Sequence, residues 1–194
     1  ITENLIKSSF TEIKEYSSFF NEFKKNKIEL KNLRSNNTLS QIIQNENIRF
    51  INPRNFERDL LLKKKERKIL LTIDDGFLSF YEYAWPILRE KEIPFILFVN
   101  TREVGSYNYM NWQQIKELHK ENFVEIGNHS HSHEYLVDEA ASVIKKDILQ
   151  SIKIFKEQLG KNSDFFSYPF GEYNLEFKEI IKSLNFRYAF GQHS

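Results

Sequence analysis

The chain has 194 residues, of which 40% are hydrophobic and 15% aromatic, and its formal net charge is +1. This length and apolar content exclude a disordered chain and fit one globular domain, or one domain with an appendage. The small net charge argues against duplex nucleic acid as a partner, the absence of cysteine excludes disulfides and thiolate metal sites, and no stretch is long and apolar enough to span a membrane.

The first 47 residues differ from the rest of the chain. Asn, Lys, Ser and Glu are common among them, and apolar residues at three- and four-residue steps predict a helix over about residues 11–25. A second, shorter helix is expected near residues 39–43. No pattern in this segment indicates chemistry. We therefore interpret residues 1–47 as a mainly helical N-terminal extension that acts as a cap or as a surface for a partner.

From residue 48 onward, short apolar runs alternate with helical patterns. Regular alternation of strand and helix requires parallel strands joined by right-handed crossovers, which predicts an α/β fold. Pro86 is expected to end or kink the helix around it, and Gly160 is expected to end the longest helix. The expected strands are 48–51, 70–73, 94–100, 123–127, 165–168 and 186–190, and the expected helices are 77–91, 112–120, 140–159 and 175–184.

Polar clusters come directly after three of the expected strands. Asp74 and Asp75 follow the first of these, residues 128–133 follow another, and residues 169–171 follow a third. The carboxyl ends of parallel strands lie at one rim of a sheet or barrel, where ligands and chemistry gather. The sequence therefore predicts a site at this rim.

The two adjacent acids need an explanation, because neighbouring carboxylates repel each other unless a cation or a shared proton relieves the charge. Taken alone, Asp74, Asp75 and Gly76 are explained equally well as a polar turn between a strand and a helix. The histidines further along the chain favour the cation.

His129 and His133 are four residues apart. On a helix or a tight turn this spacing points both imidazoles the same way, whereas His131 points elsewhere. Two histidines and one carboxylate are a standard set for zinc or another borderline divalent metal, with positions left for water and substrate. Asp75 or Asp74 would supply the carboxylate, and the other acid would then stand beside the ion as a base.

Three segments resemble the motifs of the polysaccharide deacetylases, carbohydrate esterase family four. Residues 72–76 (Thr-Ile-Asp-Asp-Gly) are similar to the first motif, in which the second position is usually Phe. Residues 129–133 match the second motif, His-Ser/Thr-x-x-His, and residues 167–171 (Ser-Tyr-Pro-Phe-Gly) resemble the third less closely. The resemblance covers about residues 68–190. It implies that residues 48–194 form a distorted (β/α) barrel of parallel strands, which we expect to be incomplete at its carboxyl end.

The resemblance also implies a role for each matching residue. Asp75, His129 and His133 would bind a divalent metal, with Zn²⁺ favoured and Co²⁺ or Ni²⁺ as alternatives. Asp74 would be the general base, and the backbone N–H of Phe170 would be part of the oxyanion hole.

The aromatic residues near the third motif have two interpretations. Tyr168 and Tyr173 could contact substrate by stacking on sugar rings, as could Trp112 and Phe170. A place in the core is at least as good an interpretation of each, because aromatic side chains pack cores first.

The sequence departs from the family pattern at two places. Ser167 stands where many members have an Arg that steadies the catalytic Asp. The family usually supplies a His acid near the end of the domain, and His193 is the candidate here, with a flexible terminal His as the alternative.

The resemblance implies a metal-dependent hydrolase that removes N-acetyl groups from an N-acetylhexosamine polysaccharide, either exopolysaccharide or peptidoglycan. The substrate in turn implies a place outside the cytoplasm, in the periplasm or at the cell surface. Two alternatives stay open. One is a catalytically silent sugar-binding or scaffold module that keeps the metal site, and the other is an esterase that removes O-acetyl groups, as from acetylated xylan.

Overall fold

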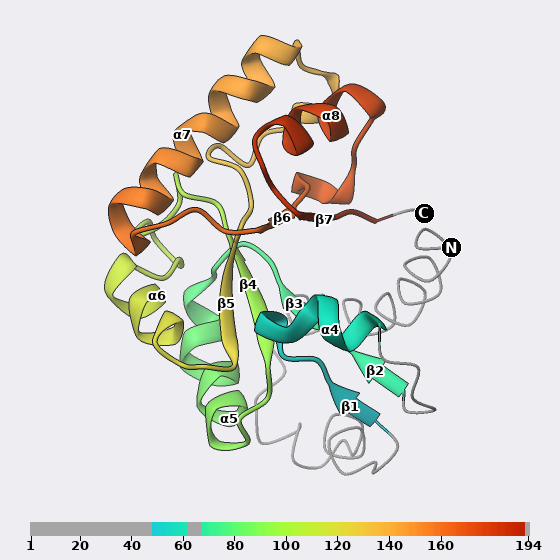
Figure 1. Ribbon diagram of the computed structural model, residues 1–194. Helices are drawn as coiled ribbons and strands as arrows, with labels where there is room; N and C mark the ends of the chain where they lie inside the picture. Colours follow the sequence, from blue (N-terminus) through green and yellow to red (C-terminus); the bar gives the residue numbers. More distant parts are fainter. Residues whose placement is uncertain (1–47, 62–66, 193–194) are drawn as a thin grey trace.

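The computed structural model describes residues 48–61 and 67–192, and parallel strands form its centre (Figure 1). The helices expected within residues 1–47, and His193, lie outside the described residues. A two-stranded sheet pairs β1 (Ile48–Phe50) with β2 (Arg67–Ile69). A five-stranded sheet follows in chain order: β3 (Leu71–Ile73), β4 (Phe95–Val99), β5 (Val124–Asn128), β6 (Phe165–Ser167) and β7 (Tyr188–Phe190).

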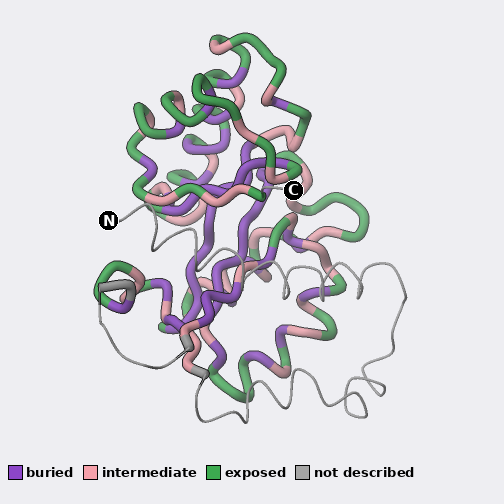
Figure 2. Tube along the Cα trace, turned by 90° about the vertical axis from the view of Figure 1, so that its right-hand side faces the viewer, coloured by how far each residue is buried: buried purple, intermediate pink, exposed green. Residues whose placement is uncertain are grey.

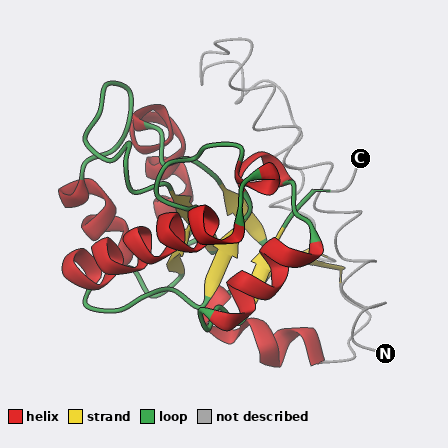
Figure 3. Ribbon diagram, turned by 90° about the horizontal axis from the view of Figure 1, so that it is seen from above, coloured by secondary structure: helices red, strands yellow, loops and turns green. Residues whose placement is uncertain are grey.

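All strand pairs of the two sheets are parallel, and a helical segment lies in each connection of the larger sheet. Leu70 alone separates β2 from β3, so the chain passes directly from the smaller sheet into the larger one. This arrangement is a curled half-barrel and confirms the predicted α/β fold. Seen from above, the helices lie around the strands (Figure 3). The helices are η1 (Pro53–Asn55), α4 (Phe56–Leu61), η2 (Phe80–Ala84), α5 (Trp85–Glu90), α6 (Trp112–His119), η3 (Leu136–Asp138), α7 (Ala141–Leu159), η4 (Pro169–Gly171) and α8 (Leu175–Ser183).

Side chains of the central strands alternate between two apolar layers, because successive residues of a strand face opposite sides. Ile96 and Phe98 of β4 pack inside the half-barrel with Leu70 and Phe165. Their neighbours Leu97 and Val99 pack outside, against residues of η2, α5, α6 and α7. The strands therefore form the buried centre of the molecule, while exposed segments lie on the outer helices and loops (Figure 2).

The helix expected at residues 77–91 is divided into the π-helix η2 and the α-helix α5. Pro86 lies in the first turn of α5 and has no N–H to donate into the preceding turn. The N–H of Trp85 donates to the carbonyl of Phe80, five residues earlier. The chain widens at η2 to accommodate Pro86 and then continues as a helix, so the proline changes the helix without ending it.

Gly160 ends α7 in the left-handed conformation, with φ of 80°, and its N–H donates to the Lys156 carbonyl at 3.1 Å. This confirms the predicted end of the longest described helix.

Candidate metal centre

Asp75, His129 and His133 converge at the carboxyl rim of the sheet. Their candidate ligand atoms all lie within 4.8 Å of one another. His133 Nε2 lies 3.2 Å from Asp75 Oδ1, and His129 Nε2 lies 3.6 Å from the same oxygen. The two imidazole rings are 4.8 Å apart between centroids. The structure therefore brings together the two histidines and the second of the two acids singled out in the sequence.

A sharp turn after β3 places Asp75. The residue has φ of 74°, and Gly76 has φ of 76°. Two successive left-handed residues reverse the chain where the strand ends, and Gly76 adopts this conformation without the penalty that a side chain brings. The Gly76 N–H donates to the Asp74 carbonyl at 3.0 Å, and its own carbonyl accepts from the Met110 N–H at 2.9 Å. The turn is thereby fixed, with Asp75 at the rim.

The histidines lie on a tight loop that follows β5, and not on a helix. Ser130 and His133 both have positive φ, at 67° and 56°. The Ser130 hydroxyl accepts from the His133 N–H at 3.0 Å, which folds the loop back on itself. His131 points elsewhere, with Nδ1 2.8 Å from the Thr101 hydroxyl.

The surroundings of His129 determine which of its nitrogens carries the proton. Nδ1 lies 2.7 Å from the backbone carbonyl oxygen of Ser167. A carbonyl only accepts hydrogen bonds, so Nδ1 carries a proton, and in the neutral ring Nε2, which faces Asp75, is the nitrogen with the lone pair. This is the tautomer that a metal-binding histidine needs, and carbonyl oxygens are common partners of such histidines. The donor set and its orientation therefore fit a divalent cation.

Asp74 is open to solvent at the rim, yet protein atoms surround it closely. Desolvation by this protein raises the pKa of Asp74 above its ordinary value. The nearby His129 lowers the pKa, the charge of Asp75 raises it, and a hydrogen bond from the Ser167 hydroxyl lowers it. Ser167, which stands where the family resemblance leads us to expect Arg, thus contacts Asp74 directly.

Phe170 lies on the rim beside His133. Its backbone has φ of 59°, its side chain is 56% exposed, and its ring centroid is 4.9 Å from that of His133. The ring of Tyr135 packs against Phe170 at 5.7 Å. The predicted oxyanion role of the Phe170 N–H stays a prediction, but the residue lies next to the candidate ligands.

Tyr168 lies in the core between β6 and α8, only 3% exposed. Its ring is stacked on Tyr173 at 4.8 Å and meets the Phe177 ring edge-on at 5.0 Å. This packing argues against the predicted contact of Tyr168 with a sugar, because protein covers the ring. Tyr173 is half-buried, and Trp112 packs against the outer apolar layer.

Two residues near the site were not singled out in the sequence. The Tyr109 ring stacks on Phe77 at 4.8 Å, and its pKa is raised first by burial and then by the charge of Asp75. Asp147 of α7 accepts hydrogen bonds from the histidine loop. Asp147 could have been noticed as an acid one position from Ile148, on the helix face that the apolar pattern predicts to be buried.

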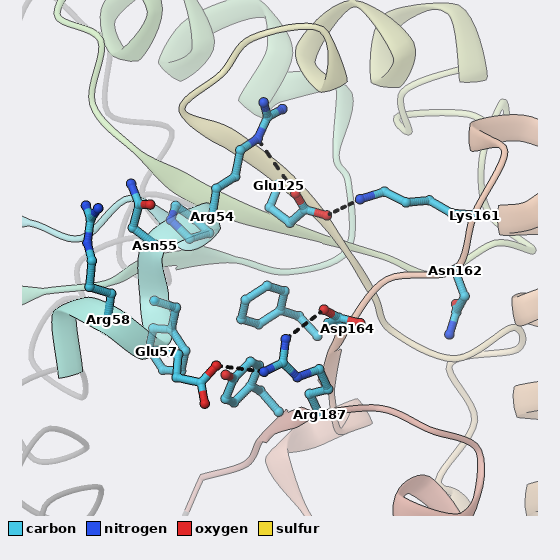
Figure 4. A pocket seen from close by; sticks show the side chains of 13 residues that line it. Arg54, Asn55, Glu57, Arg58, Glu125, Lys161, Asn162, Asp164 and Arg187 are labelled. Atoms are coloured by element: carbon cyan, nitrogen blue, oxygen red, sulfur yellow. Dashed lines mark hydrogen bonds and ion pairs between the residues drawn. The ribbon is translucent and has the colours of Figure 1, made fainter. Parts of the chain in front are cut away.

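The opposite end of the half-barrel holds a charged cavity of about 540 Å³ (Figure 4). Glu125, at the start of β5, lies 3.6 Å from Lys161 and 4.0 Å from Arg54 in ion pairs. Arg187 forms a second group of ion pairs there with Glu57 and Asp164. The charges at this end are thus paired with one another.

No helix among the described residues is long and apolar enough to cross a membrane. The partner surface expected in residues 1–47 lies outside the described part of the chain.

Comparison with known proteins agrees with the motifs. A family model described as polysaccharide deacetylase matches residues 62–189. The poly-beta-1,6-N-acetyl-D-glucosamine N-deacetylase of Staphylococcus aureus is 28% identical over 148 residues, which cover 68% of this chain and 51% of the relative. This chain therefore spans about half the length of the curated relatives of that name.

Two solved structures share the fold. IcaB from Ammonifex degensii has a TM-score of 0.69 and 26% identity, covering 75% of this chain and 70% of that one. The Streptococcus pyogenes deacetylase PplD, in complex with acetate, has a TM-score of 0.68 and 26% identity, covering 76% and 66%. These likenesses confirm the expected distorted (β/α) barrel and the family resemblance.

Proposed function

The chain belongs to the polysaccharide deacetylase family, and from this membership we propose that it is a metal-dependent N-deacetylase. In this proposal it hydrolyses the acetamide groups of an N-acetylhexosamine polymer. The observation that carries the proposal is the convergence of Asp75, His129 and His133 at one rim, with Asp74 beside them.

Asp75, His129 and His133 would hold the cation, and we favour Zn²⁺ because two imidazoles and one carboxylate suit a borderline metal. A bound divalent cation supplies Lewis acidity, which polarises a carbonyl and makes water more acidic. The carbonyl of Ser167 keeps His129 in the tautomer that this task requires.

Asp74 would act as the general base that takes a proton from the attacking water. Its solvent-open position lets water reach it, and the Ser167 hydroxyl orients its carboxylate. As the acetamide carbon becomes tetrahedral, its oxygen gains negative charge, to which the Phe170 N–H would donate. Asp74 would then carry the proton taken from water, and it could donate this proton to the leaving amine.

The substrate we favour is a poly-β-1,6-N-acetylglucosamine chain, because the Staphylococcus aureus relative is named for that polymer. Peptidoglycan is the second substrate to test. Either polymer would place the protein outside the cytoplasm, at the cell surface or in the periplasm.

Acetate release from β-1,6-linked N-acetylglucosamine oligomers tests this function. The protein is first treated with a chelator and then supplied with Zn²⁺ or Co²⁺, and release is expected only with the cation. Asp74→Asn should lower the rate by about 10²–10⁴-fold without loss of cation binding. The control Asp164→Asn changes an exposed acid at the opposite end and should leave the rate unaltered. Release that persists without the cation, or that ignores Asp74→Asn, would overturn the assignment.

Ser167 motivates the competing proposal of a catalytically silent sugar-binding module. Such a module would bind the oligomers, with cation present, and release no acetate. An O-deacetylase is distinguished by comparing acetylated xylan with the N-acetylated oligomers as substrates, since it would release acetate faster from the ester.

A further inference from the structure

We propose that Asp147 is a positioning residue that sets the histidine loop, residues 129–133, for cation binding. The inference rests on the metal site of the proposed function, and it concerns a residue of α7 that lies outside the three motifs.

The histidine loop has a backbone that needs external support. Ser130 and His133 both adopt left-handed conformations, which cost free energy for residues other than glycine. His133 is the more exposed of the two histidines, with 24% of its side chain accessible against 2% for His129. Packing alone therefore constrains His133 less than His129. The orientation of His133 depends more on hydrogen bonds that hold the loop backbone.

Asp147 supplies such hydrogen bonds to the middle of the loop. Its Oδ1 accepts from the His131 N–H at 2.8 Å, and its Oδ2 accepts from the Ser132 N–H at 3.0 Å. Hydrogen bonds to an ionised carboxylate are roughly twice as strong as those between neutral groups. Both oxygens are used, so the carboxylate fixes the orientation of two successive peptide groups between the candidate ligands.

A second contact from the same helix holds the start of the loop. The Ser151 hydroxyl shares its one proton between the Ile148 carbonyl at 2.8 Å and Asn128 Oδ1 at 3.0 Å. The same Asn128 oxygen accepts from the Ser130 N–H at 3.0 Å. Ser151 lies one turn after Asp147, so α7 contacts the loop at two points one helical turn apart.

The helix itself is firmly placed. Ile144 and Ile148 of α7 are fully buried in the apolar layer against β6 and α8. A 19-residue helix anchored in this way is a stiff support. The position of His133 Nε2 relative to Asp75 is therefore set partly by the core behind the loop, through Asp147.

Asp147→Asn tests this role with almost no change in shape. An amide has one acceptor oxygen, so one of the two N–H groups would lose its partner and face the NH₂ donor instead. Residues that orient metal ligands typically contribute 10–100-fold in affinity, and we expect the Kd for Zn²⁺ to rise by about tenfold. Asp147→Ala removes both acceptors and should raise the Kd further.

Glu157→Gln is the matched control. Glu157 lies on the same helix, is exposed, and pairs with Lys153 four residues before it. The variant removes the same charge from α7, so it corrects for any long-range effect of that charge on the cation. We expect its Kd for Zn²⁺ to equal that of the wild type.

The Kd is measured by calorimetric titration of the chelator-treated protein, and amide hydrogen exchange of the 129–133 region is measured without metal. Asp147→Asn should speed exchange in this region, while the thermal midpoint of the metal-free protein shows that the variant is folded. An unaltered Kd and unaltered exchange in a folded Asp147→Asn variant would overturn the inference. Zn²⁺ binding without acetate release would overturn only the proposed activity, and no Zn²⁺ binding by the wild type would overturn both.

Discussion

The two ends of β5 place an inward-facing ionisable side chain in opposite chemical surroundings. Glu125, at the amino end, is 7% exposed and lies beside the cations Lys161 and Arg54. His129 follows the carboxyl end, is 2% exposed, and lies beside the carboxylate of Asp75. At one end, cations of the chain offset the buried negative charge. At the other, two adjacent acids meet imidazoles whose lone pairs can be shared with a further ion.

This difference shows why one end is a candidate site and the other is not. A buried charge is tolerated when opposite charges lie nearby, and Glu125 meets that condition within the protein itself. Desolvation raises the pKa of Asp74, and the charge of Asp75 raises it further, a cost of ionisation that a bound cation would relieve. The ion pairs at the amino end should therefore stabilise the fold. The acids at the carboxyl end should bind a cation and lower the stability of the metal-free protein.

Paired substitutions at the two ends give the largest expected effect. Asp75→Asn removes the candidate carboxylate ligand and should abolish Zn²⁺ binding. A Lewis acid contributes several kcal/mol to such reactions, so acetate release should fall by about 10³-fold or more. The metal-free variant should unfold at the same or a higher temperature, because the acid beside Asp74 is gone and Asn tolerates the left-handed conformation.

Glu125→Gln is the counterpart at the amino end. It should leave Zn²⁺ binding and acetate release unaltered and lower the free energy of unfolding by at most about 1 kcal/mol, because both cationic partners are partly exposed. If Glu125→Gln weakened Zn²⁺ binding as Asp75→Asn does, the two ends would not be separate.

Gly127 lies between the two ends of β5, where the absence of a side chain leaves room for the buried Phe98 ring. A Cβ at this position would lie 2.3 Å from Cδ1 of Phe98, a ring with no exposed surface. Overpacking of this kind costs about 1–3 kcal/mol, so Gly127→Ala should lower the thermal midpoint by several degrees. Phe98→Leu in the Gly127→Ala background should recover part of the loss. Additive effects of the two changes would show that the clash has no energetic consequence.

Ser167→Ala isolates the contact with Asp74 at the carboxyl end. The hydroxyl hydrogen bond to the carboxylate disappears, while the backbone carbonyl that holds His129 remains. A hydrogen bond to a charged group contributes about 1.5–3 kcal/mol, and we expect acetate release to fall by about tenfold. The Kd for Zn²⁺ should stay the same. An unaltered rate would mean that Ser167 does not replace the family's Arg in steadying Asp74.

His119 provides the smallest expected effect, near the amino end. Burial lowers the pKa of His119 below its ordinary value, while Glu125 raises it and Lys161 lowers it. The unfolded chain then takes up a proton at a higher pH than the folded protein. The stability that neutral His119 contributes is therefore present above about pH 6.5 and is lost as the pH falls toward the lowered pKa.

Thermal midpoints of the wild type and His119→Gln, at about pH 7.5 and about pH 5.5, measure this contribution. The midpoint should fall less on acidification in the variant than in the wild type. Equal falls would assign the acid sensitivity to other groups.

Much of the fold could be predicted from local patterns. The apolar runs gave the positions of β3 to β7, and the three- and four-residue spacing gave α6, α7 and α8. Gly160 marked the end of α7 because only a residue tolerant of positive φ ends a helix in this way. The meeting of the candidate ligands at one rim could be predicted because every polar cluster follows a strand of a parallel sheet.

What the sequence could not supply depends on contacts between distant segments. Every residue but one of the run 165–168 is aromatic, so the sequence does not reveal which side chains are exposed. The burial of Tyr168 against α8 therefore could not be predicted. The place of His119 on its helix does not reveal its burial: the residue is half-buried, and its Nδ1 has no hydrogen-bond partner among the described residues. Asp147 lies 16 residues from His131, and only the path of α7 brings them together.

The Phe98 ring also fills the inside of the half-barrel between its two ends. It lies over Gly127, packs against Phe190 at 5.5 Å between centroids, and, with Ile96, has no exposed surface. This buried layer lies between the candidate metal centre at the rim and the charged cavity at the opposite end. In the proposed reaction, water and the polymer's acetamide would therefore reach the candidate metal centre from the rim side, and acetate would leave from the same side.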